Sequence, residues 1–396
     1  MSTDTKTAAA STKPLVDYQT IDADGHTVFA STEWWKPYMP EKYWEWAPKP
    51  VTEPNQEGNF QCEGRIFKLP FPYPGAGDSA SLGGLMTPGG WRLEDLSNVT
   101  VENARKAGGA LAEDRLRAMD ADGVAVAYLY PSEMLSLPWA IISSHFAAVV
   151  TRAHNDWLAD YCKADPHRLR GAALLPQQDL MLAVEEMERA KKNGLPTVML
   201  RPNPINGLKF DHPNYDRLWA TAIDLDIGIG IHEGFGVEMP TIGNDRSNNW
   251  LEVHALEHPT EHMAACMAFT MGGVLQRFPK LRVGFLESGA GWAGFWLNRL
   301  DEHYEKFLRF YPGLDLLPSE YFKRQCFLGI EPDYELIPHL VEQGLEDTMV
   351  FSSDFPHFDA IYPGSVAALV ERDDLSDETK RKLLRDNPLR LYGVDS

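Results

Sequence analysis

Residues 18–26 read Tyr-Gln-Thr-Ile-Asp-Ala-Asp-Gly-His, a short strand-like run that ends in the side chains of Asp24 and His26. Three later stretches repeat this arrangement, an apolar run followed by a candidate metal ligand. They are residues 227–231 before His232, 283–286 before Glu287, and 349–352 before Asp354. Ligands at the ends of strands 1, 5, 6 and 8 of a barrel converge at its C-terminal rim, so these residues can share an ion. The pattern predicts a metalloenzyme.

Short apolar runs alternate with helical patterns along the rest of the chain. Counting the run at Ile21 first, we expect eight strands, the other seven at residues 123–130, 169–175, 197–200, 227–231, 281–286, 325–329 and 348–352. Helices are expected at residues 111–119, 147–161, 180–192, 215–223, 262–277, 295–307, 335–342 and 378–385. Near-continuously apolar strands separated by helices are typical of a parallel sheet covered on both faces. Eight such units, with no Gly-rich phosphate loop, favour a (β/α)8 TIM barrel over a doubly wound sheet.

The domain organisation expected is one barrel over residues 15–396. Residues 1–14 are polar and lack the apolar stretch of a secretory signal, so we expect a disordered leader. A long insertion, about residues 32–109, separates strands 1 and 2 and is rich in Trp, Pro and Gly. An insertion there lies on the ligand face of a barrel, where it can act as a lid over the metal or as a packing and oligomer contact.

Composition narrows the class of protein. With 396 residues and 44% hydrophobic content, the chain can bury a full core. A formal net charge of −20 without a basic stripe argues against nucleic-acid binding. No apolar run approaches the roughly 20 residues of a membrane helix. The four cysteines are scattered without CxxC spacing, which favours buried free thiols in the cytoplasm. We expect a soluble enzyme for a small-molecule substrate.

A set of motifs in the same order resembles a known family. The motifs are Ile21-Asp-Ala-Asp-Gly-His26, His232-Glu-Gly, residues 273–292, Ser352-Ser-Asp-Phe-Pro-His357 and residues 387–392. Together they resemble the amidohydrolase-related family, the branch of the metal-dependent hydrolases that includes aminocarboxymuconate-semialdehyde decarboxylase. The resemblance covers residues 20–393 and implies a barrel with a divalent ion, often zinc or manganese, at its rim. It also implies hydrolysis or non-oxidative decarboxylation.

The resemblance assigns roles to the rim residues. The family's first motif is usually His-x-His, whereas this chain has Asp24-x-His26, and a carboxylate there favours harder ions such as manganese or iron over zinc. His232 matches the strand-5 ligand, and Asp354 matches the strand-8 aspartate that binds metal and accepts a proton from its water. Glu287 stands where decarboxylase-like members carry a histidine, so it is a general base, a metal ligand or a bridge between two ions.

The number of ions stays open from the sequence. Asp24, Glu287 and Asp354 place three carboxylates at one point, which requires compensating positive charge. One divalent ion of Mn, Fe or Zn supplies +2 and two supply +4. Three further candidate ligands leave a dinuclear site open: His258, His262 and His357. His258 and His262 could instead belong to a helix that starts at the His-Pro-Thr-Glu-His segment. His357 is also a candidate catalytic residue that could hold the substrate, or it could fix the turn at Asp354.

Arg201 ends the fourth strand, where many barrels of the superfamily place a bridging lysine or a histidine. No lysine is there, which excludes a carbamate-bridged pair of metals. The planar guanidinium of Arg201 suits it to anchor a substrate carboxylate, and its alternative role is a structural ion pair with Glu233.

The function expected is metal-dependent hydrolysis or non-oxidative decarboxylation of a small carboxylate or amide. A metal-activated water would act at the rim, with Asp354 accepting its proton. Two alternatives remain at this point. One is a dinuclear iron or manganese monooxygenase that activates oxygen, and the other is a non-catalytic partner subunit in a homo- or hetero-oligomer.

Overall fold

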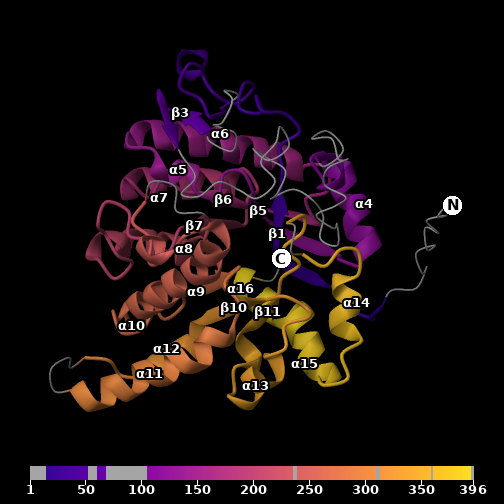
Figure 1. Cartoon of the computed structure of the whole chain (residues 1–396), viewed down its shortest axis with the longest axis vertical. Coiled ribbons are helices and arrows are strands. Elements are labelled where there is room, and N and C mark those ends of the chain that lie inside the picture. The colour runs from indigo at the N-terminus through magenta and orange to yellow at the C-terminus, as the bar shows by residue number, and fades with distance from the viewer. Residues whose placement is uncertain are drawn as a thin grey trace.

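The computed structural model describes residues 15–51, 60–67, 105–234, 239–308, 313–357 and 360–393. At its centre is an eight-stranded sheet whose neighbouring strands all run parallel (Figure 1). In order, the strands are β1 (Ile21–Thr27), β5 (Val126–Pro131), β6 (Leu169–Leu174), β7 (Thr197–Leu200), β8 (Ile229–His232), β9 (Val283–Leu286), β10 (Cys326–Ile330) and β11 (Met349–Phe351). Almost every residue in them is buried, as the continuous apolar runs predict.

Backbone hydrogen bonds join the first strand to the segment after the last one. The amide of Asp354 donates to the carbonyl of Asp24 at 3.0 Å, and the amide of His26 donates to the carbonyl of Phe355 at 2.7 Å. These bonds curl the sheet into a nearly closed barrel. The predicted (β/α)8 fold is therefore confirmed.

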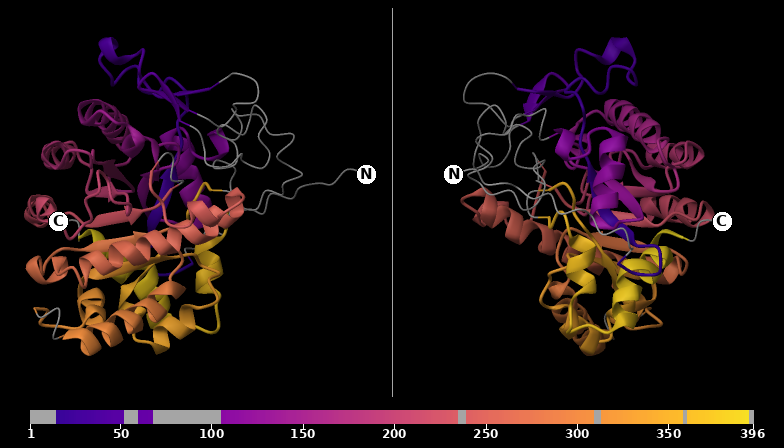
Figure 2. Two further views of the ribbon diagram at one scale, coloured as in Figure 1. Left: turned by 60° about the vertical axis from the view of Figure 1, so that its left-hand side comes forward. Right: turned by 90° about the vertical axis from the view of Figure 1, so that its right-hand side faces the viewer.

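Helices surround the barrel on its outer side (Figure 2). They are α4 (Ala112–Asp122), α5 (Leu137–Ala140), α6 (Ser144–Cys162), α7 (Leu180–Lys192), α8 (Asp216–Asp224), α9 (Trp250–Phe269), α10 (Val274–Arg277), α11 (Gly291–Phe307), α12 (Pro318–Gln325), α13 (Ile337–Glu342), α14 (Ser365–Val370), α15 (Asp377–Arg381) and α16 (Asn387–Tyr392). The cap of α7 illustrates their local origin, because Asp179 accepts hydrogen bonds from the amides of Met181 and Leu182 at 2.9 and 3.2 Å.

Among the differences from the predicted helices, which include the unpredicted α12 and α14, the difference at α9 bears on the site. We expected a helix at residues 262–277, but α9 begins at Trp250, where the Asn249 side chain caps it, and it ends at Phe269. Pro259 lies inside α9 although proline disfavours helix interiors. The earlier start adds three turns, and these turns bring a histidine to the site that the sequence prediction did not include.

The side chain of Tyr392, on the last described helix, packs inside the barrel. Tyr392 of α16 stacks on Tyr128 with ring centroids 3.6 Å apart, and its hydroxyl donates to the carbonyl of Ala23 at 2.5 Å. A second hydroxyl contact joins Tyr392 to Tyr130 at 3.0 Å. Gly230 permits this arrangement, because a Cβ there would lie 2.2 Å from the Tyr130 hydroxyl oxygen. The interior below the rim is thus filled by aromatic side chains.

The insertion after β1 is described only in part. Residues 52–59 and 68–104 lie outside the described residues, as do Trp91 and the predicted leader, residues 1–14. The described part holds a small antiparallel sheet at one end of the molecule, made of β2 (Lys49–Pro50), β3 (Phe60–Cys62) and β4 (Arg65–Phe67) (Figures 1 and 2). Trp34 and Trp35 are buried. The lid or oligomer role of the insertion stays a prediction.

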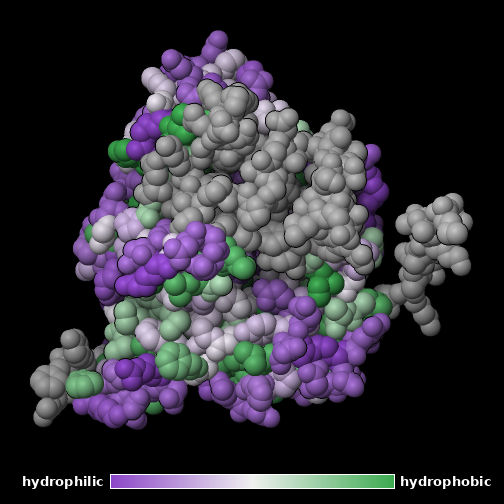
Figure 3. Space-filling model, viewed as in Figure 1, coloured by the Kyte–Doolittle hydropathy of each residue, from purple (hydrophilic) through white to green (hydrophobic). Residues whose placement is uncertain are grey.

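Among the helices of the described residues, none is both long enough and apolar enough to span a membrane. Hydrophilic and apolar side chains are interspersed over the face shown in Figure 3. The four cysteines are free and buried, as expected.

An aromatic cluster between the insertion and α6 encloses a buried histidine. His154 packs against the rings of Phe29, Trp34 and Trp157 at centroid distances of 6.0, 6.0 and 5.6 Å. Burial lowers the pKa of His154 to about 4. The folded protein therefore holds this imidazole neutral, whereas the unfolded chain protonates it below about pH 6.5.

Replacing His154 by phenylalanine is expected to make the free energy of unfolding depend less on pH. Between pH 6.5 and 4 the unfolded chain binds a proton that the folded protein does not, so the wild type loses stability as the pH falls. From pH 7 to pH 5 this loss is about 2 kcal/mol more for the wild type than for His154→Phe. Urea denaturation at both pH values measures it. The exposed His339→Gln variant should follow the wild type, and equal losses in His154→Phe and wild type would contradict the assignment.

Candidate metal centre

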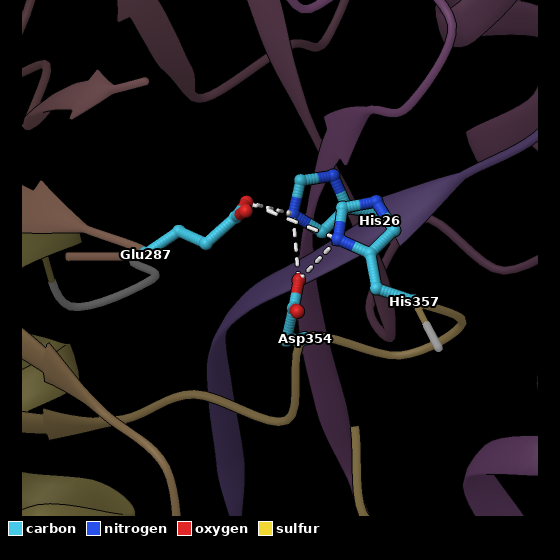
Figure 4. Close-up of side chains that lie close together, drawn as sticks. All are labelled: His26, Glu287, Asp354 and His357. Atoms are coloured by element: carbon cyan, nitrogen blue, oxygen red, sulfur yellow. Dashed lines mark ion pairs between the residues drawn. The ribbon is translucent and has the colours of Figure 1, made fainter. Parts of the chain in front are cut away.

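Five of the predicted ligands meet at the C-terminal rim, namely Asp24, His26, His232, Glu287 and Asp354. The Nε2 atom of His26 lies 3.6 Å from Asp24 Oδ1, 3.2 Å from Asp354 Oδ1 and 3.7 Å from Glu287 Oε2. The Nε2 atom of His232 lies 3.4 Å from Asp24 Oδ1 and 3.1 Å from Glu287 Oε2. Figure 4 shows His26, Glu287 and Asp354 pointing toward one another, with His357 beside them. The convergence predicted from strands 1, 5, 6 and 8 is present in the structure.

Backbone carbonyls orient both imidazoles. His26 Nδ1 lies 3.0 Å from the Pro131 carbonyl, and His232 Nδ1 lies 2.6 Å from the Glu233 carbonyl. Each Nδ1 therefore donates its proton to a carbonyl, so that Nε2 is the nitrogen that faces the site. Histidine ligands of metals are commonly held by such a bond at the other ring nitrogen.

The atoms at the centre of this group fit a divalent cation. Four of them are buried and have no hydrogen-bond partner among the described residues: Asp24 Oδ1, His26 Nε2, His232 Nε2 and Glu287 Oε2. Leaving a buried polar atom unpaired costs about 1–3 kcal/mol, so four at one point indicate a missing partner. Neighbouring ligands on one ion, with bonds of about 2.1–2.3 Å, lie about 3.0–3.3 Å apart. The observed spacings of 3.1–3.7 Å are close to this.

A buried ion pair beneath the rim, Asp22 with Arg115, holds β1 and the segment after β11 together. Asp22 accepts hydrogen bonds from the Ser353 amide at 2.9 Å and the Ser353 hydroxyl at 2.6 Å, which fixes the residue before Asp354. Arg115 lies 3.6 Å from Asp22 and donates to the carbonyls of His26 and Phe355 at 3.0 and 2.9 Å. No sequence pattern indicated this role, because Asp22 was interpreted only as a strand residue.

Gly25 leaves room for the side chain of Arg115 beside Asp22. A Cβ at this position would lie 2.3 Å from an Arg115 nitrogen and 2.6 Å from an Asp22 oxygen. The glycine at the centre of the Asp-Gly-His motif is therefore needed for packing.

Two of the site carboxylates stand on left-handed backbone. Glu287 has φ 50° and Asp354 has φ 53°, a conformation that residues other than glycine rarely adopt. Glu287 follows β9 directly and Asp354 lies three residues beyond the end of β11, where the chain turns toward the barrel mouth. Non-glycine residues held in this region are enriched at functional sites.

The charged groups of the site raise the pKa of His232 and lower those of His26 and Glu287. Burial lowers the pKa of His232, but Asp24 and Glu287 raise it more strongly, to about 10. At His26, burial and the neighbouring imidazoles of His357 and His232 hold the pKa well below its usual range. Burial raises the pKa of Glu287, yet His232, His357 and His258 together outweigh it and hold the pKa well below its usual range. The carboxylates thus concentrate negative charge that a divalent cation would offset.

The other predicted histidines separate into three roles. His357 Nδ1 lies 2.6 Å from Asp354 Oδ1 and its Nε2 lies 3.1 Å from the Ser132 hydroxyl, so it contacts the proposed proton acceptor. His258 approaches Glu287. The structure does not bring His262 to the site, because its Nδ1 and Nε2 lie 2.7 and 3.0 Å from the carbonyls of His258 and Ile231. The metal-ligand hypothesis for His262 has no support in this geometry.

The sequence prediction missed His254. Its Nε2 lies 3.9 Å from Glu287 Oε1, and it belongs to a possible ligand group with His258 and Glu287. The available signal was the four-residue spacing of His254, His258 and His262, which places them along one face of a helix. The helix was predicted to begin at residue 262, so His254 and His258 were not recognised as part of that helix face.

Arg201 lies in a buried ion network instead of the barrel mouth. It is fully buried, forms an ion pair with Glu233 and lies 3.8 Å from Glu257. Its Nη1 also donates to the Gly234 carbonyl at 2.6 Å. Of the two roles considered from the sequence, the geometry matches the structural ion pair with Glu233, and the anchor for a substrate carboxylate has no exposed guanidinium to support it.

Comparison with known families decides the membership of this chain. The family model described as Amidohydrolase matches residues 21–394, nearly the whole sequence. The chain belongs to the amidohydrolase family. The resemblance inferred from the motifs is thereby confirmed.

The relatives of this amidohydrolase family member include decarboxylases. A 2-amino-3-carboxymuconate-6-semialdehyde decarboxylase from Dictyostelium discoideum is 26% identical over 248 residues, which are 61% of this chain and 66% of the relative. A gamma-resorcylate decarboxylase from Rhodococcus jostii is 26% identical over 270 residues, 65% of this chain and 80% of the relative. Neither name describes an oxygen-activating enzyme, so the comparisons do not support the monooxygenase alternative.

Solved structures share the fold. An amidohydrolase from Mycobacterium avium subsp. paratuberculosis superimposes with a TM-score of 0.77 at 19% identity, covering 96% of this chain and 99% of its own. A 5-carboxyvanillate decarboxylase from Novosphingobium aromaticivorans, solved with manganese, gives a TM-score of 0.66 at 20% identity, covering 96% and 97%. Related decarboxylases thus carry manganese, in agreement with the divalent metal predicted here.

Proposed function

We propose that this protein is a divalent-metal-dependent decarboxylase of a small carboxylic acid, of the aromatic or enol class. The observation that carries the proposal is the convergence of Asp24, His26, His232 and Asp354 on one buried point in a family whose relatives include decarboxylases. Hydrolysis, which the sequence left open, gains no observation of its own from the site.

The chain's residues divide the work of such a reaction. Asp24, His26 and His232 would hold the cation, with Asp354 and Glu287 beside them. When bound, the cation supplies positive charge that holds the substrate's carboxylate and a neighbouring oxygen and stabilises negative charge there. The buried walls around Tyr130 exclude water from the inner side of the site.

Asp354 and His357 are placed to handle the proton. In a non-oxidative decarboxylation the bond between the ring or enol carbon and the carboxylate breaks, and carbon dioxide leaves. The carbon takes up a proton in its place, and no oxidant or reductant is needed. His357 Nδ1 is 2.6 Å from Asp354 Oδ1, close enough to pass that proton between them. Asp354 can then deliver it to the carbon.

The proposal is tested by supplying manganese to the purified protein and offering gamma-resorcylate and related hydroxylated aromatic acids. Release of carbon dioxide and incorporation of one deuterium from heavy water at the carbon that lost the carboxylate are expected. The rate should be the same under nitrogen and in air. Hydrolysis of an amide without carbon dioxide release, or turnover that requires oxygen, would overturn the proposal, and no turnover with any acid would favour a non-catalytic subunit.

Asp354→Asn is expected to lower kcat by roughly 10²- to 10⁴-fold, the usual effect of losing a positioned proton donor or acceptor. Asparagine tolerates the left-handed backbone at this position and keeps one oxygen near the metal, so metal content should fall much less than turnover. The exposed Asp377→Asn variant is the matched control. Unchanged kcat in Asp354→Asn with full metal content would remove Asp354 from the proton path.

A further inference from the structure

The side chain of Tyr392 enters the barrel from the end opposite the metal centre. Its helix, α16, lies beside β10 and β11 (Figure 1). The Asn387 side chain donates to the carbonyl of Met349, the first residue of β11, at 2.7 Å. Leu391 lies against the start of β8, because a Cβ at Gly228 would be 2.2 Å from the Leu391 carbonyl oxygen. The helix thus covers the end at which the strands begin, and Tyr392 extends from there toward the rim.

The hydroxyl of Tyr392 contacts two residues that lie next to proposed metal ligands. It donates to the carbonyl of Ala23, the residue before Asp24, at 2.5 Å. It also lies 3.0 Å from the hydroxyl of Tyr130. The ring of Tyr130 stacks on the imidazole of His232, with centroids 5.4 Å apart and planes 26° apart. One hydroxyl group therefore connects the ligand from β1 with the ligand from β8.

The strand that carries Asp24 is irregular at the point of contact. The register between β1 and β5 shifts between Asp22 and Gly25, so the described pairing gives neither Ala23 nor Asp24 a partner on β5. A bulge of this kind interrupts the ladder and redirects side chains, and bulges are common beside active sites. A buried backbone carbonyl needs a hydrogen-bond donor, which Tyr392 supplies to Ala23. The direction of the Asp24 side chain thus depends on a residue from the other end of the sequence.

The two tyrosine hydroxyls form a directed pair. Tyr130 and Tyr392 are buried, and burial together with the Asp24 carboxylate raises the pKa of Tyr130. Burial and the neighbouring Tyr130 raise the pKa of Tyr392 in the same way, so both hydroxyls keep their protons. A tyrosine hydroxyl has one proton to donate, and that of Tyr392 goes to the Ala23 carbonyl. Tyr130 is therefore the donor between the two, and its ring is held in place over His232.

We propose that Tyr392 is a positioning residue of the metal centre, which sets the places of Asp24 and His232 without contacting the ion. The inference rests on the metal centre of the proposed function and adds a residue that acts on it from the far end of the barrel. Removing an outer partner of a metal ligand lowers metal affinity or activity roughly 10- to 100-fold. Tyr392→Phe removes the hydroxyl and keeps the ring that stacks on Tyr128, so the variant should fold and bind Mn²⁺ about 10-fold more weakly.

The test measures Mn²⁺ binding by the chelator-treated full-length protein. Calorimetry with Mn²⁺ alone gives the Kd, and electron paramagnetic resonance of the bound Mn²⁺ reports the symmetry of its ligands. Tyr161→Phe is the matched control, because Tyr161 is also buried and its hydroxyl also donates to a backbone carbonyl, that of Gly109, at 2.5 Å. Tyr161 belongs to α6, outside the barrel. Tyr392→Phe should raise the Kd and change the spectrum, whereas Tyr161→Phe should lose stability without either effect.

The outcomes separate the positioning role from general loosening of the fold and from the proposed function. His339→Ala, at an exposed histidine, should bind Mn²⁺ like the wild type. A wild-type Kd in Tyr392→Phe, or an equal rise of the Kd in Tyr161→Phe, would overturn the positioning role. Weaker Mn²⁺ binding in Tyr392→Phe, with no decarboxylation by the wild type, would overturn the proposed function alone. Decarboxylation by the wild type, with a Kd that Tyr392→Phe leaves unchanged, would overturn the positioning role alone.

Discussion

His232→Ala is expected to empty the metal position and to lower turnover by roughly 10³-fold or more. The imidazole of His232 contacts both Asp24 and Glu287, and its removal leaves the carboxylates with one neutral ligand fewer at the closest point of the group. Loss of a partner that only orients a ligand already lowers metal affinity or activity roughly 10- to 100-fold. Loss of the ligand should cost more, because no other nitrogen among the described residues lies as close to both carboxylates.

Metal content and kcat of the purified variant measure this effect, with thermal unfolding as a check on the fold. Three companion variants should also lose metal while folding normally: Asp24→Ala, His26→Ala and Asp354→Ala. His339→Ala serves again as the surface control. Full metal occupancy in any two of the four site variants would mean that the ion is bound elsewhere.

Arg201→Leu is expected to destabilise the protein by about 3–5 kcal/mol, the usual effect of removing one partner of a buried ion pair. The guanidinium lies among three buried acids, Glu233, Glu257 and Glu261. Burial raises the pKa of Glu233 well above its usual range even with Arg201 beside it. Without the arginine the acids would lose a buried positive charge, and the backbone carbonyl of Gly234 and the side chain of Asn203 would lose a hydrogen-bond donor.

Urea or thermal denaturation of Arg201→Leu measures the loss, and Arg246→Leu, at an exposed arginine, should unfold like the wild type. The alternative considered from the sequence makes a different prediction. If Arg201 anchored a substrate carboxylate, the variant would keep its stability and show a raised KM. That result would require the guanidinium to leave its pair with Glu233 during catalysis.

The sequence predicted the barrel and the residues that converge at its rim because both depend on local patterns. A strand that is apolar throughout is recognisable by itself, and a ligand placed directly after it can only lie at the rim. Asp24, His26, His232, Glu287 and Asp354 were found in this way. The closing of the barrel by Asp354 and Asp24 follows from the same register.

The remaining features depend on contacts between distant segments. Pro259 suggested a helix start, and the cap that sets the true start is Asn249, so His254 was placed outside the helix and outside the site. Whether Arg201 points into the mouth or into a cluster of acids depends on which glutamates α9 brings beside it. The role of Arg115 likewise arises only where β1 meets the loop after β11.

The left-handed backbone at Glu287 and Asp354 lowers the stability of the fold, whereas their carboxylates serve the proposed metal centre. Glycine at either position would relieve about 1–2 kcal/mol of conformational strain and also remove a negative charge from a crowded point. Selection for thermal stability in the absence of metal would therefore favour losing these two carboxylates first. Engineering of a more robust barrel should leave residues 287 and 354 unchanged and seek its gains in the outer helices, where stability and turnover are not in conflict.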